Sequence, residues 1–433
     1  MRHAAGLLAG ALALAACGQG GGHRAKRDGA AVVVVGAEAT GVEVEPNPAA
    51  RPQALTVPGR VSGVIAADGP EGADVDAYTF TARESGMARV ALDGAADCDL
   101  TLDVEDATGA RLLRSDNGKG GTVEGAPNLG LEAGQVLTVI VREFAKVEKK
   151  KVKRTPRATA CAPYGLAVTL APAPAAGEEK EPNDQAAFAG EAPVPGEVTG
   201  YAGWRRDRDV WKVATGTIPE GEALAVDVDA VPNVALRVEV LDATEAVLLE
   251  RVGKTGEPVA VRNVAVKAGE PHVYVVVGAS QGNLDERYTL RVRSAPLELD
   301  EESEPNDKVG DATPLADIPG ATDGARVGFL GRGDVDVFKL DPAPTPRTLH
   351  VTVEPPAGVD VALQLLDAAG GAIGVPVNGA GKGAAEQLAP TAIAPAQQLY
   401  VKVSVIAGGS DAMRYRLRWS AAAAEAAPAL EEP

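Results

Sequence analysis

An acidic pentapeptide, Glu-x-Glu-Pro-Asn, occurs three times in the chain, at 43–47, 179–183 and 302–306. Each copy places two carboxylates and an amide oxygen within five residues, and the alternation of an extended backbone turns both glutamates to one side. Calcium takes about six to eight such hard oxygen ligands and tolerates irregular loops. The same residue types also build ordinary turns, in which Asn caps the backbone and Glu faces water. The motif therefore allows two interpretations, a calcium site and a turn.

The pentapeptide is the first of four landmarks that recur in the same order in three units. The second is Asp-x-Asp before an aromatic residue, the third is an apolar stretch that ends at a turn aspartate, and the fourth is a closing stretch led by a tyrosine. These later landmarks are Asp74, Asp76, Tyr78, Asp106 and Tyr164, then Asp207, Asp209, Trp211, Asp242 and Tyr288, then Asp334, Asp336, Phe338, Asp367 and Tyr415. Such repetition predicts three copies of one domain.

The elements that must position these residues are predicted to be β-strands. Apolar residues alternate with polar ones at 100–104, 236–240 and 361–365, which is the period of a strand with one buried face. Turn signals such as Asp116-Asn117-Gly118 separate short strands, and the chain is rich in glycine (50) and proline (31). No stretch of the three units shows a sustained helical period. We therefore expect an all-β protein of three tandem antiparallel β-sandwich domains.

At these landmarks each unit resembles the bacterial pre-peptidase C-terminal domain, a small jelly-roll-like β-sandwich usually found beside secreted proteases. The marks of that family are an N-terminal Glu-Pro-Asn-Asp and a strand with Gly-Asp-x-Asp before an aromatic residue. The second and third units carry the first mark at 181–184 and 304–307, and the third adds the second mark at 333–338. The first unit departs, because Pro48 stands where the family has aspartate. The resemblance covers most of residues 43–420.

In collagen-binding relatives of this family, the acidic segment and the aspartates before the aromatic strand together hold calcium. The resemblance therefore implies a Ca²⁺ ligand set in each unit. The sets are Glu43, Glu45, Asn47 and Asp76, then Glu179, Glu181, Asn183, Asp184 and Asp209, then Glu302, Glu304, Asn306, Asp307 and Asp336. Those relatives also use an acid three residues before the last aspartate, where this chain has Ala73, Arg206 and Gly333. We expect the third unit to bind calcium most readily and the first, one ligand short, least readily.

No catalytic constellation is recognisable in the sequence. It contains no Gly-x-Ser-x-Gly, His-Glu-x-x-His, Walker loop or dinucleotide fingerprint. Beyond the N-terminal segment, the histidines are His23, His272 and His350, and the last two lie in strand-like sequence. The carboxylate pairs could suggest a glycosidase, but they recur in every unit as structural elements do, and aromatic residues are only 3% of the chain. We expect a protein that is not an enzyme.

The N-terminal residues are typical of an exported bacterial lipoprotein. A short positive start precedes an apolar run at 4–14, which is too short to span a bilayer as a mature helix. The run ends in Leu-Ala-Ala-Cys-Gly at 14–18, which resembles the lipobox, where a signal peptidase cuts before a cysteine that is then diacylated. The resemblance implies cleavage of residues 1–16 and lipidation of Cys17. The small and polar residues that follow predict a flexible linker over 17–42. The alternative is an ordinary signal peptide with a chance cysteine.

Two further cysteines, Cys98 and Cys161, both lie in the first unit. Exported proteins fold in an oxidising compartment, so this pair predicts a disulfide that ties the strand around Leu100 to the start of the closing strand. A loop of that length contributes about 4 kcal/mol in the chain-entropy model. The alternative is a pair of buried thiols. A catalytic thiol is not expected, because the unit contains no histidine.

The first unit also carries a basic insertion before its closing stretch, predicted to be a hairpin tip or a loop. On a chain of net charge −18 this insertion is a strong local asymmetry. It could dock on anionic lipid headgroups or on surface polysaccharide near the anchor, or it could be a solvated hairpin end. The residues concerned are Lys149, Lys150, Lys151, Lys153 and Arg154. The negative net charge argues against nucleic acid as a partner.

The expected order along the chain is a lipoprotein signal peptide, a linker, three sandwiches and a disordered tail. The boundaries are 1–16, 17–42, 43–172, 173–296, 297–420 and 421–433. We expect a non-catalytic, membrane-anchored lipoprotein whose sandwiches form a binding or spacer array at the cell envelope, with an envelope protein or polysaccharide as its unidentified partner. Gly18 does not resemble the aspartate that retains lipoproteins in the inner membrane, which favours the outer membrane and leaves its face open.

The alternative function is an accessory module that binds carbohydrate or fibrous protein for a separate secreted enzyme. An exposed row of aromatic side chains on one sheet face would favour this alternative. Because aromatic residues are scarce in the chain, the first interpretation is preferred.

Overall fold

A computed structural model describes residues 39–70, 72–148, 151–153, 156–267 and 269–423. Nearly all regular structure in these ranges is β-strand, and their one helical element is a 3-10 turn, η1 (Ala186–Phe188). Within the same ranges, no helix is long and apolar enough to cross a membrane. The described residues all belong to one compact unit. The all-β prediction is confirmed, whereas the predicted signal peptide and Cys17 lie outside the described residues.

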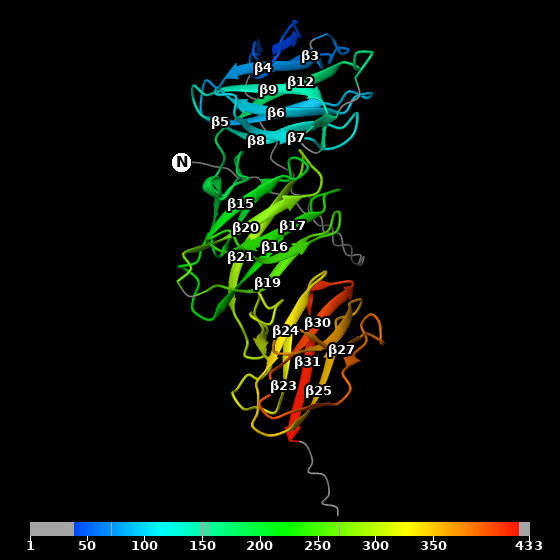
Figure 1. The fold of residues 1–433 in the computed structure, drawn as a ribbon. Helices are drawn as coiled ribbons and strands as arrows, with labels where there is room; N and C mark the ends of the chain where they lie inside the picture. The colour runs from blue at the N-terminus through cyan, green and yellow to red at the C-terminus, as the bar shows by residue number, and fades with distance from the viewer. Residues whose placement is uncertain (1–38, 71, 149–150, 154–155, 268, 424–433) are drawn as a thin grey trace, which may run out of the picture. The chain divides into compact units, whose positions relative to one another are not determined.

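The first sandwich consists of two five-stranded sheets (Figure 1). One sheet contains, in hydrogen-bonded order, β1 (Ala39–Val42), β3 (Gly59–Gly63), β12 (Tyr164–Ala171), β5 (Gly86–Asp93) and β8 (Glu124–Leu131). The other contains β2 (Gln53–Ala54), β4 (Val75–Thr81), β9 (Val136–Glu143), β6 (Leu100–Asp106) and β7 (Arg111–Ser115). Alternating apolar residues of both sheets face each other and form the core, as a sandwich requires.

The second and third sandwiches repeat this plan. In the second, the sheets are β13 (Gly190–Ala192), β15 (Arg208–Ala214), β20 (His272–Ala279), β17 (Leu236–Leu241) and β18 (Val247–Val252), and β14 (Gly196–Tyr201), β21 (Arg287–Pro296), β16 (Glu222–Val228) and β19 (Val259–Ala265). In the third, they are β22 (Thr313–Pro314), β24 (Val335–Leu340), β30 (Leu399–Ala407), β26 (Asp360–Leu366) and β27 (Ala372–Val377), and β23 (Asp323–Leu330), β31 (Ser410–Ala423), β25 (Arg347–Glu354) and β28 (Glu386–Gln387), with β29 (Thr391–Ile393) also paired to β25. Each sandwich has its own apolar core.

The ladders are mainly antiparallel, as predicted, and a few parallel pairs lie at sheet edges. Strand β2 pairs with β4 in parallel, and the same edge pairing joins β13 to β15 and β22 to β24. The reason is the connection: between β2 and β4 the chain passes through β3 in the opposite sheet, so it returns to the first sheet in the same direction. A further parallel pair, β1 with β3, lies at the edge of the other sheet in the first sandwich.

Two strands lie wholly or partly outside the predicted sandwich ranges. Strand β1 lies at the end of the predicted linker 17–42, where its backbone bonds to β3 order it. Strand β31 continues to Ala423, three residues into the predicted tail, because its ladder with β25 runs as far as Arg347. Ala421 is fully buried in the core of the third sandwich. Residues 424–433 of the predicted tail lie outside the described ranges.

The predicted disulfide is confirmed. Cys98 and Cys161 are bonded, with their Cα atoms 5.8 Å apart. The bond ties the segment before β6 to the segment before β12, as expected. In the basic insertion, β10 (Lys146–Glu148) and β11 (Lys151–Lys153) pair antiparallel as a hairpin. Lys149, Lys150 and Arg154 of the predicted anionic-surface site lie outside the described residues.

A short parallel bridge joins each sandwich to the one before it. The N–H of Glu181 donates to the carbonyl of Asn128 at 3.1 Å, and the N–H of Gly130 donates to the carbonyl of Glu181 at 2.8 Å. The equivalent bonds join Glu304 to β19 at 2.8 Å each. The second glutamate of the second and third pentapeptides therefore extends the edge of the preceding sheet with its backbone.

Candidate metal centres

Three clusters of carboxylates form where the repeated motifs meet, one in each sandwich. Within each cluster, one oxygen from every member lies within 4.8 Å of the others. We call the clusters acidic site 1 (Glu43, Glu45, Asp76), acidic site 2 (Glu179, Glu181, Asp209) and acidic site 3 (Glu304, Asp334, Asp336). The fold thus brings together motifs that lie about thirty positions apart in the sequence.

The pentapeptide is held against the Asp-x-Asp strand by the same backbone bond in every copy. The carbonyl of Asn183 accepts from the N–H of Val210 at 3.2 Å, and the corresponding bonds of Asn47 and Asn306 measure 2.8 and 2.9 Å. Each Asn also donates its own N–H to the carboxylate two residues earlier, at 2.9 Å in all three copies. These bonds fix the second glutamate beside the second aspartate.

The first glutamate of each motif lies beneath a glycine of the neighbouring strand. Glu179 accepts from the N–H of Tyr201 at 2.6 Å, and Glu43 and Glu302 accept equivalent bonds at 2.9 and 2.7 Å. The preceding residue, Gly200, has no room for a side chain: a Cβ there would lie 2.7 Å from Glu179 Oε2 and 2.4 Å from Tyr288 Oη. The close approach of this backbone therefore requires glycine.

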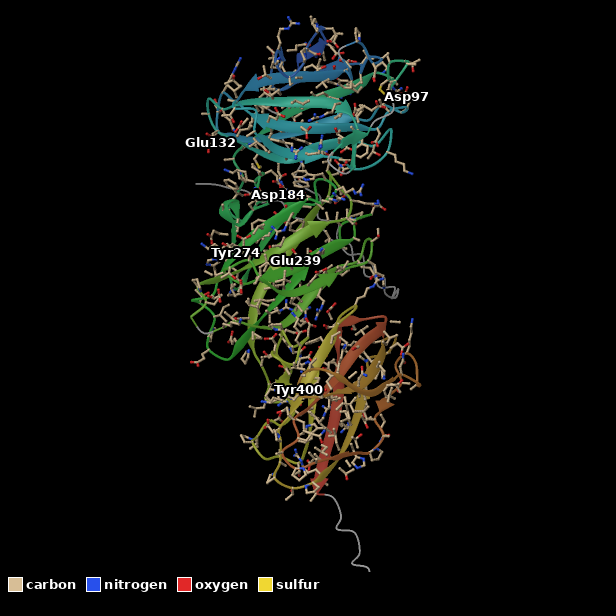
Figure 2. The ribbon with its side chains drawn as sticks, viewed as in Figure 1. Asp97, Glu132, Asp184, Glu239, Tyr274 and Tyr400 are labelled. Carbon is tan, nitrogen blue, oxygen red and sulfur yellow. A yellow bond between two sulfur atoms is a disulfide. The ribbon has the colours of Figure 1, made fainter. Side chains whose placement is uncertain are left out.

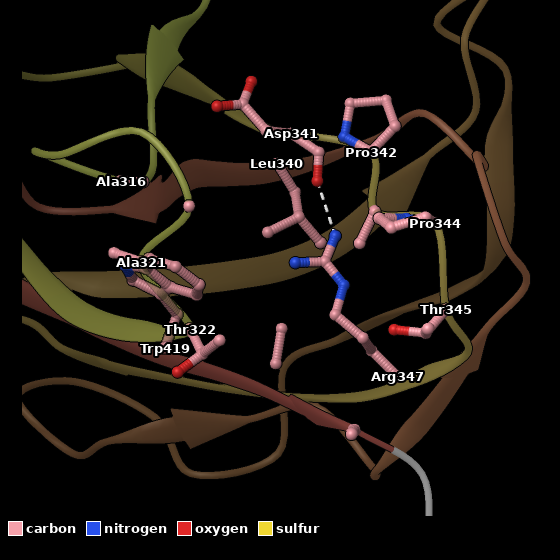
Figure 3. A pocket seen from close by; sticks show the side chains of 14 residues that line it. Ala316, Ala321, Thr322, Leu340, Asp341, Pro342, Pro344, Thr345, Arg347 and Trp419 are labelled. Carbon is pink, nitrogen blue, oxygen red and sulfur yellow. Dashed lines mark hydrogen bonds between the residues drawn. The ribbon is translucent and has the colours of Figure 1, made fainter.

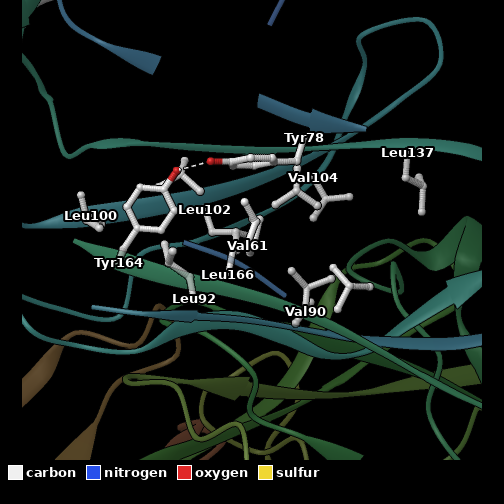
Figure 4. Packing of buried hydrophobic residues seen from close by; sticks show 14 of the residues in the cluster. Val61, Tyr78, Val90, Leu92, Leu100, Leu102, Val104, Leu137, Tyr164 and Leu166 are labelled. Carbon is white, nitrogen blue, oxygen red and sulfur yellow. Dashed lines mark hydrogen bonds between the residues drawn. The ribbon is translucent and has the colours of Figure 1, made fainter. Parts of the chain in front are cut away.

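Tyrosines among the aromatic landmarks donate hydrogen bonds to the carboxylates. The hydroxyls of Tyr78 and Tyr164 lie 2.7 Å apart (Figure 4). Tyr164 donates its hydroxyl to Asp76 at 2.6 Å, and Tyr78 donates to Glu43 at 3.0 Å. In the third sandwich, the closing Tyr415 donates to Glu302 at 2.5 Å. The sequence marked these aromatic residues as landmarks but gave no hint of this role, because the donor and acceptor lie in different strands.

Acidic sites 2 and 3 are buried, whereas acidic site 1 combines buried Asp76 with half-buried Glu43 and exposed Glu45. Burial dominates the electrostatics of the buried carboxylates. It raises the pKa of Asp76 to about 9, against a hydrogen bond from Tyr164 that lowers it. In acidic site 2, burial raises the pKa of Glu181 and Asp209 well above the usual range, with further increases from the charges of Asp207 and Glu179 respectively. Such groups stay ionised only if a positive charge compensates the lost hydration.

Several buried oxygens of these clusters have no hydrogen-bond partner. In acidic site 2 they are Oε1 of Glu181, Oδ1 of Asn183 and Oδ1 of Asp209, on residues at most 2% exposed. At acidic site 1, Oδ1 of Asn47 and Oδ1 of Asp76 also lack a hydrogen-bond partner. Buried oxygens without a donor are costly, and a cation that they share would satisfy them together. The residues present therefore fit a hard divalent cation such as calcium.

Three predicted carboxylate ligands are not members of the clusters. One of them, Glu302, accepts a hydrogen bond from Tyr415 instead, and the other two are Asp184 and Asp307. Asp184 is half-buried, and its carbonyl accepts from Arg208 (Figure 2). Asp307 is exposed. Neither Asp184 nor Asp307 contributes to a group of converging carboxylates. The reason is alternation, because the residue after each Asn points to the opposite side of the extended segment.

One clustered residue was missed by the sequence analysis. Asp334, the first aspartate of its Asp-x-Asp pair, belongs to acidic site 3, where it accepts from the N–H of Gly331 at 2.9 Å. Its equivalent Asp207 is fully buried beside acidic site 2. The signal was present, because residues i and i+2 of an extended chain share one side.

Other possible ligand sites offer less. All three tryptophans are buried, and the exposed aromatic residues of the described ranges, Phe144 and Phe188, lie in different sandwiches. A hollow in the third sandwich is lined mainly by small and apolar residues, and Arg347 there donates to the Asp341 carbonyl at 2.5 Å (Figure 3). These features provide no aromatic row of the kind that would favour a carbohydrate-binding module.

Comparison with known proteins adds little. No family model and no curated protein matches the chain. A “putative secreted protein” from Eubacterium rectale aligns over 56% of this chain and 81% of its own, with 7% identity and a TM-score of 0.13. The infectious bursal disease virus VP2 subviral particle aligns over 79% of this chain and 72% of its own, with 11% identity and a TM-score of 0.16. Similarities this low carry no argument about function, so the acidic sites are interpreted from their own geometry.

Proposed function

We propose that the chain is a non-catalytic lipoprotein of the cell envelope whose three sandwiches form a calcium-stabilised binding or spacer array. The observation that supports this most directly is acidic site 2. There, three carboxylates and an amide lie within a few ångströms of one another, almost fully buried, with three oxygens that lack partners. Calcium supplies the missing charge and accepts this many oxygen ligands.

The position of acidic site 2 favours a structural role for the ion. Glu181 offers a carboxylate to the site while its backbone bonds to Asn128 and Gly130 of the preceding sandwich. An ion held by this glutamate therefore also stabilises the edge where two sandwiches join. Bound calcium would therefore hold the sandwiches in a defined array, so that they do not behave as independent domains.

The expected envelope location depends on the N-terminal motif and gains support from the disulfide. A bond between Cys98 and Cys161 suits an oxidising compartment outside the cytoplasm. The accessory carbohydrate-binding alternative has no feature in its favour among the described residues, since the aromatic side chains are buried or isolated.

Thermal unfolding of the lipid-free chain (Cys17→Ser) with calcium or with chelator tests the proposal. A ligand that binds only the folded state adds about 2.7 kcal/mol at a hundredfold excess over its Kd, which should raise the Tm by a few degrees. Asp209→Asn should reduce this rise, whereas Asp184→Asn, in the same sandwich but outside the cluster, should preserve it. Identical melts of the parent chain in both conditions would contradict calcium binding.

A further inference from the structure

Acidic site 3 differs from the other two because an arginine reaches it from the preceding sandwich. Nη2 of Arg251, in β18, lies 2.9 Å from Oε1 of Glu304 and 2.6 Å from Oδ2 of Asp334. The Nε atom of the same side chain lies 3.7 Å from Asp411. Arg251 is only 8% exposed, so this is a desolvated ion-pair network and not a surface contact.

The first sandwich has no such arginine at the equivalent place. Arg251 pairs with Val238 in the second sandwich, and the matching pair in the first is Ser115 with Leu102. The Ser115 hydroxyl donates to Glu124 at 2.6 Å within its own sandwich. Among the ion pairs of the described residues, none brings a cation to Glu181 or Asp209 of acidic site 2.

The number of buried oxygens without a hydrogen-bond partner also distinguishes acidic site 3 from acidic sites 1 and 2. Acidic site 2 has three and acidic site 1 has two, counting the asparagine of each motif, whereas only Asp336 Oδ2 remains unpartnered at acidic site 3. The Asn306 amide lies beside two carboxylates, and when its nitrogen is assigned to that side, Nδ2 donates to Glu304 at 3.2 Å and to Asp336 at 3.3 Å. Acidic site 3 is thus supplied with donors from within the protein.

We propose that Arg251 is a resident cation that replaces calcium at acidic site 3, so that the chain binds two calcium ions, at acidic sites 1 and 2. This inference rests on the proposed calcium binding. A guanidinium and a calcium ion cannot both approach Glu304 and Asp334 without strong mutual repulsion. The first junction is then stabilised by an added ion, and the second by a side chain of the protein itself. This order reverses the ranking expected from the sequence.

Counting bound calcium tests the inference on the full lipid-free chain (Cys17→Ser), by equilibrium dialysis against calcium with metal analysis. The parent should bind two ions, and Arg251→Met should bind three. Arg237→Met is the matched control, since Arg237 lies in the adjacent β17 and pairs with exposed Glu250 away from the acidic sites; this variant should bind two.

A second pair of variants covers the case in which Arg251→Met does not fold. Glu304→Gln should leave two bound ions, whereas Glu181→Gln should leave one. Three ions in the parent chain, or the loss of one in Glu304→Gln, would overturn the role of Arg251 while leaving calcium binding intact. No bound ion in the parent would overturn the proposed calcium binding itself, and the inference with it.

Discussion

At the scale of single residues, the acidic sites depend on side chains that were not obvious ligands. Gly200 allows Glu179 and Tyr288 to approach the backbone, and the closing tyrosines supply hydroxyl groups beneath the carboxylates. Arg251 gives the third copy an internal counter-charge. Small differences at equivalent positions thus give three similar sandwiches different electrostatics.

Gly200→Ala should destabilise the protein and weaken calcium binding. The added methyl would lie 2.4 Å from Tyr288 Oη and 2.7 Å from Glu179 Oε2, so both must move. Overpacking of this kind costs about 1–3 kcal/mol of unfolding free energy. Urea denaturation and calcium titration measure the two effects. Gly216→Ala is the control, because a Cβ there meets nothing within 4 Å; equal losses in both variants would refute the packing argument.

Glu124 should make stability depend on pH. Burial, with the charges of Asp116 and Asp99, raises its pKa from 4.5 to about 7, although bonds from Ser115 and Asn117 oppose the rise. The folded state therefore holds the proton more tightly than the unfolded chain, and this group's contribution to stability falls as pH rises from about 4.5 to 7, by about 2–3 kcal/mol.

Comparison of Glu124→Gln with the parent isolates this contribution. The unfolding free energy of the variant, relative to the parent, should increase across that pH window in calcium-free buffer. Glu132→Gln serves as the control, since Glu132 is exposed (Figure 2). A difference between Glu124→Gln and the parent that stays constant from pH 4.5 to 7.5 would show that Glu124 titrates normally.

At the scale of strands and sheets, the sequence predicted the buried positions of the strands, because these follow from the alternation of apolar and polar residues. The alternation around Leu102, Val238 and Leu363 corresponds to buried positions of β6, β17 and β26. The parallel edge pairs were not predictable, because they depend on the route of the chain between two sheets. Arg251 was missed for a related reason, since its partners lie 53 and 83 residues away in another sandwich.

The end of β31 offers a test at this scale. Truncation after residue 420 removes Ala421, which is fully buried, together with the last three pairings to β25. The unfolding free energy should fall by about 1–3 kcal/mol, as for other losses of core contacts. Truncation after Ala423 keeps the whole described ladder and is the control. Equal denaturation midpoints for the two truncations would place residues 421–423 outside the cooperative core.

At the scale of the whole molecule, the proposed lipid on Cys17 would attach an ordered array of three sandwiches to a membrane. Cys17→Ser should remove the lipid, and with it the membrane attachment that two or three acyl chains provide. Fractionation of cells that express the parent or the variant measures this directly, with Cys17→Ser expected in the soluble fraction or retained as an uncleaved precursor. If the variant were processed normally and still sedimented with membranes, the lipoprotein assignment would be wrong.

The difference in exposure between acidic sites 1 and 2 also has a kinetic consequence. Glu45 is exposed, whereas Glu181 is 1% exposed and its backbone is bonded to Asn128 of the first sandwich. An ion can leave acidic site 1 directly, but release from acidic site 2 requires that edge to open first. Rapid mixing of the calcium-loaded protein with chelator should therefore release calcium in a fast and a slow phase of equal amplitude. The rate of the slow phase would then measure how often the edge between the first two sandwiches opens.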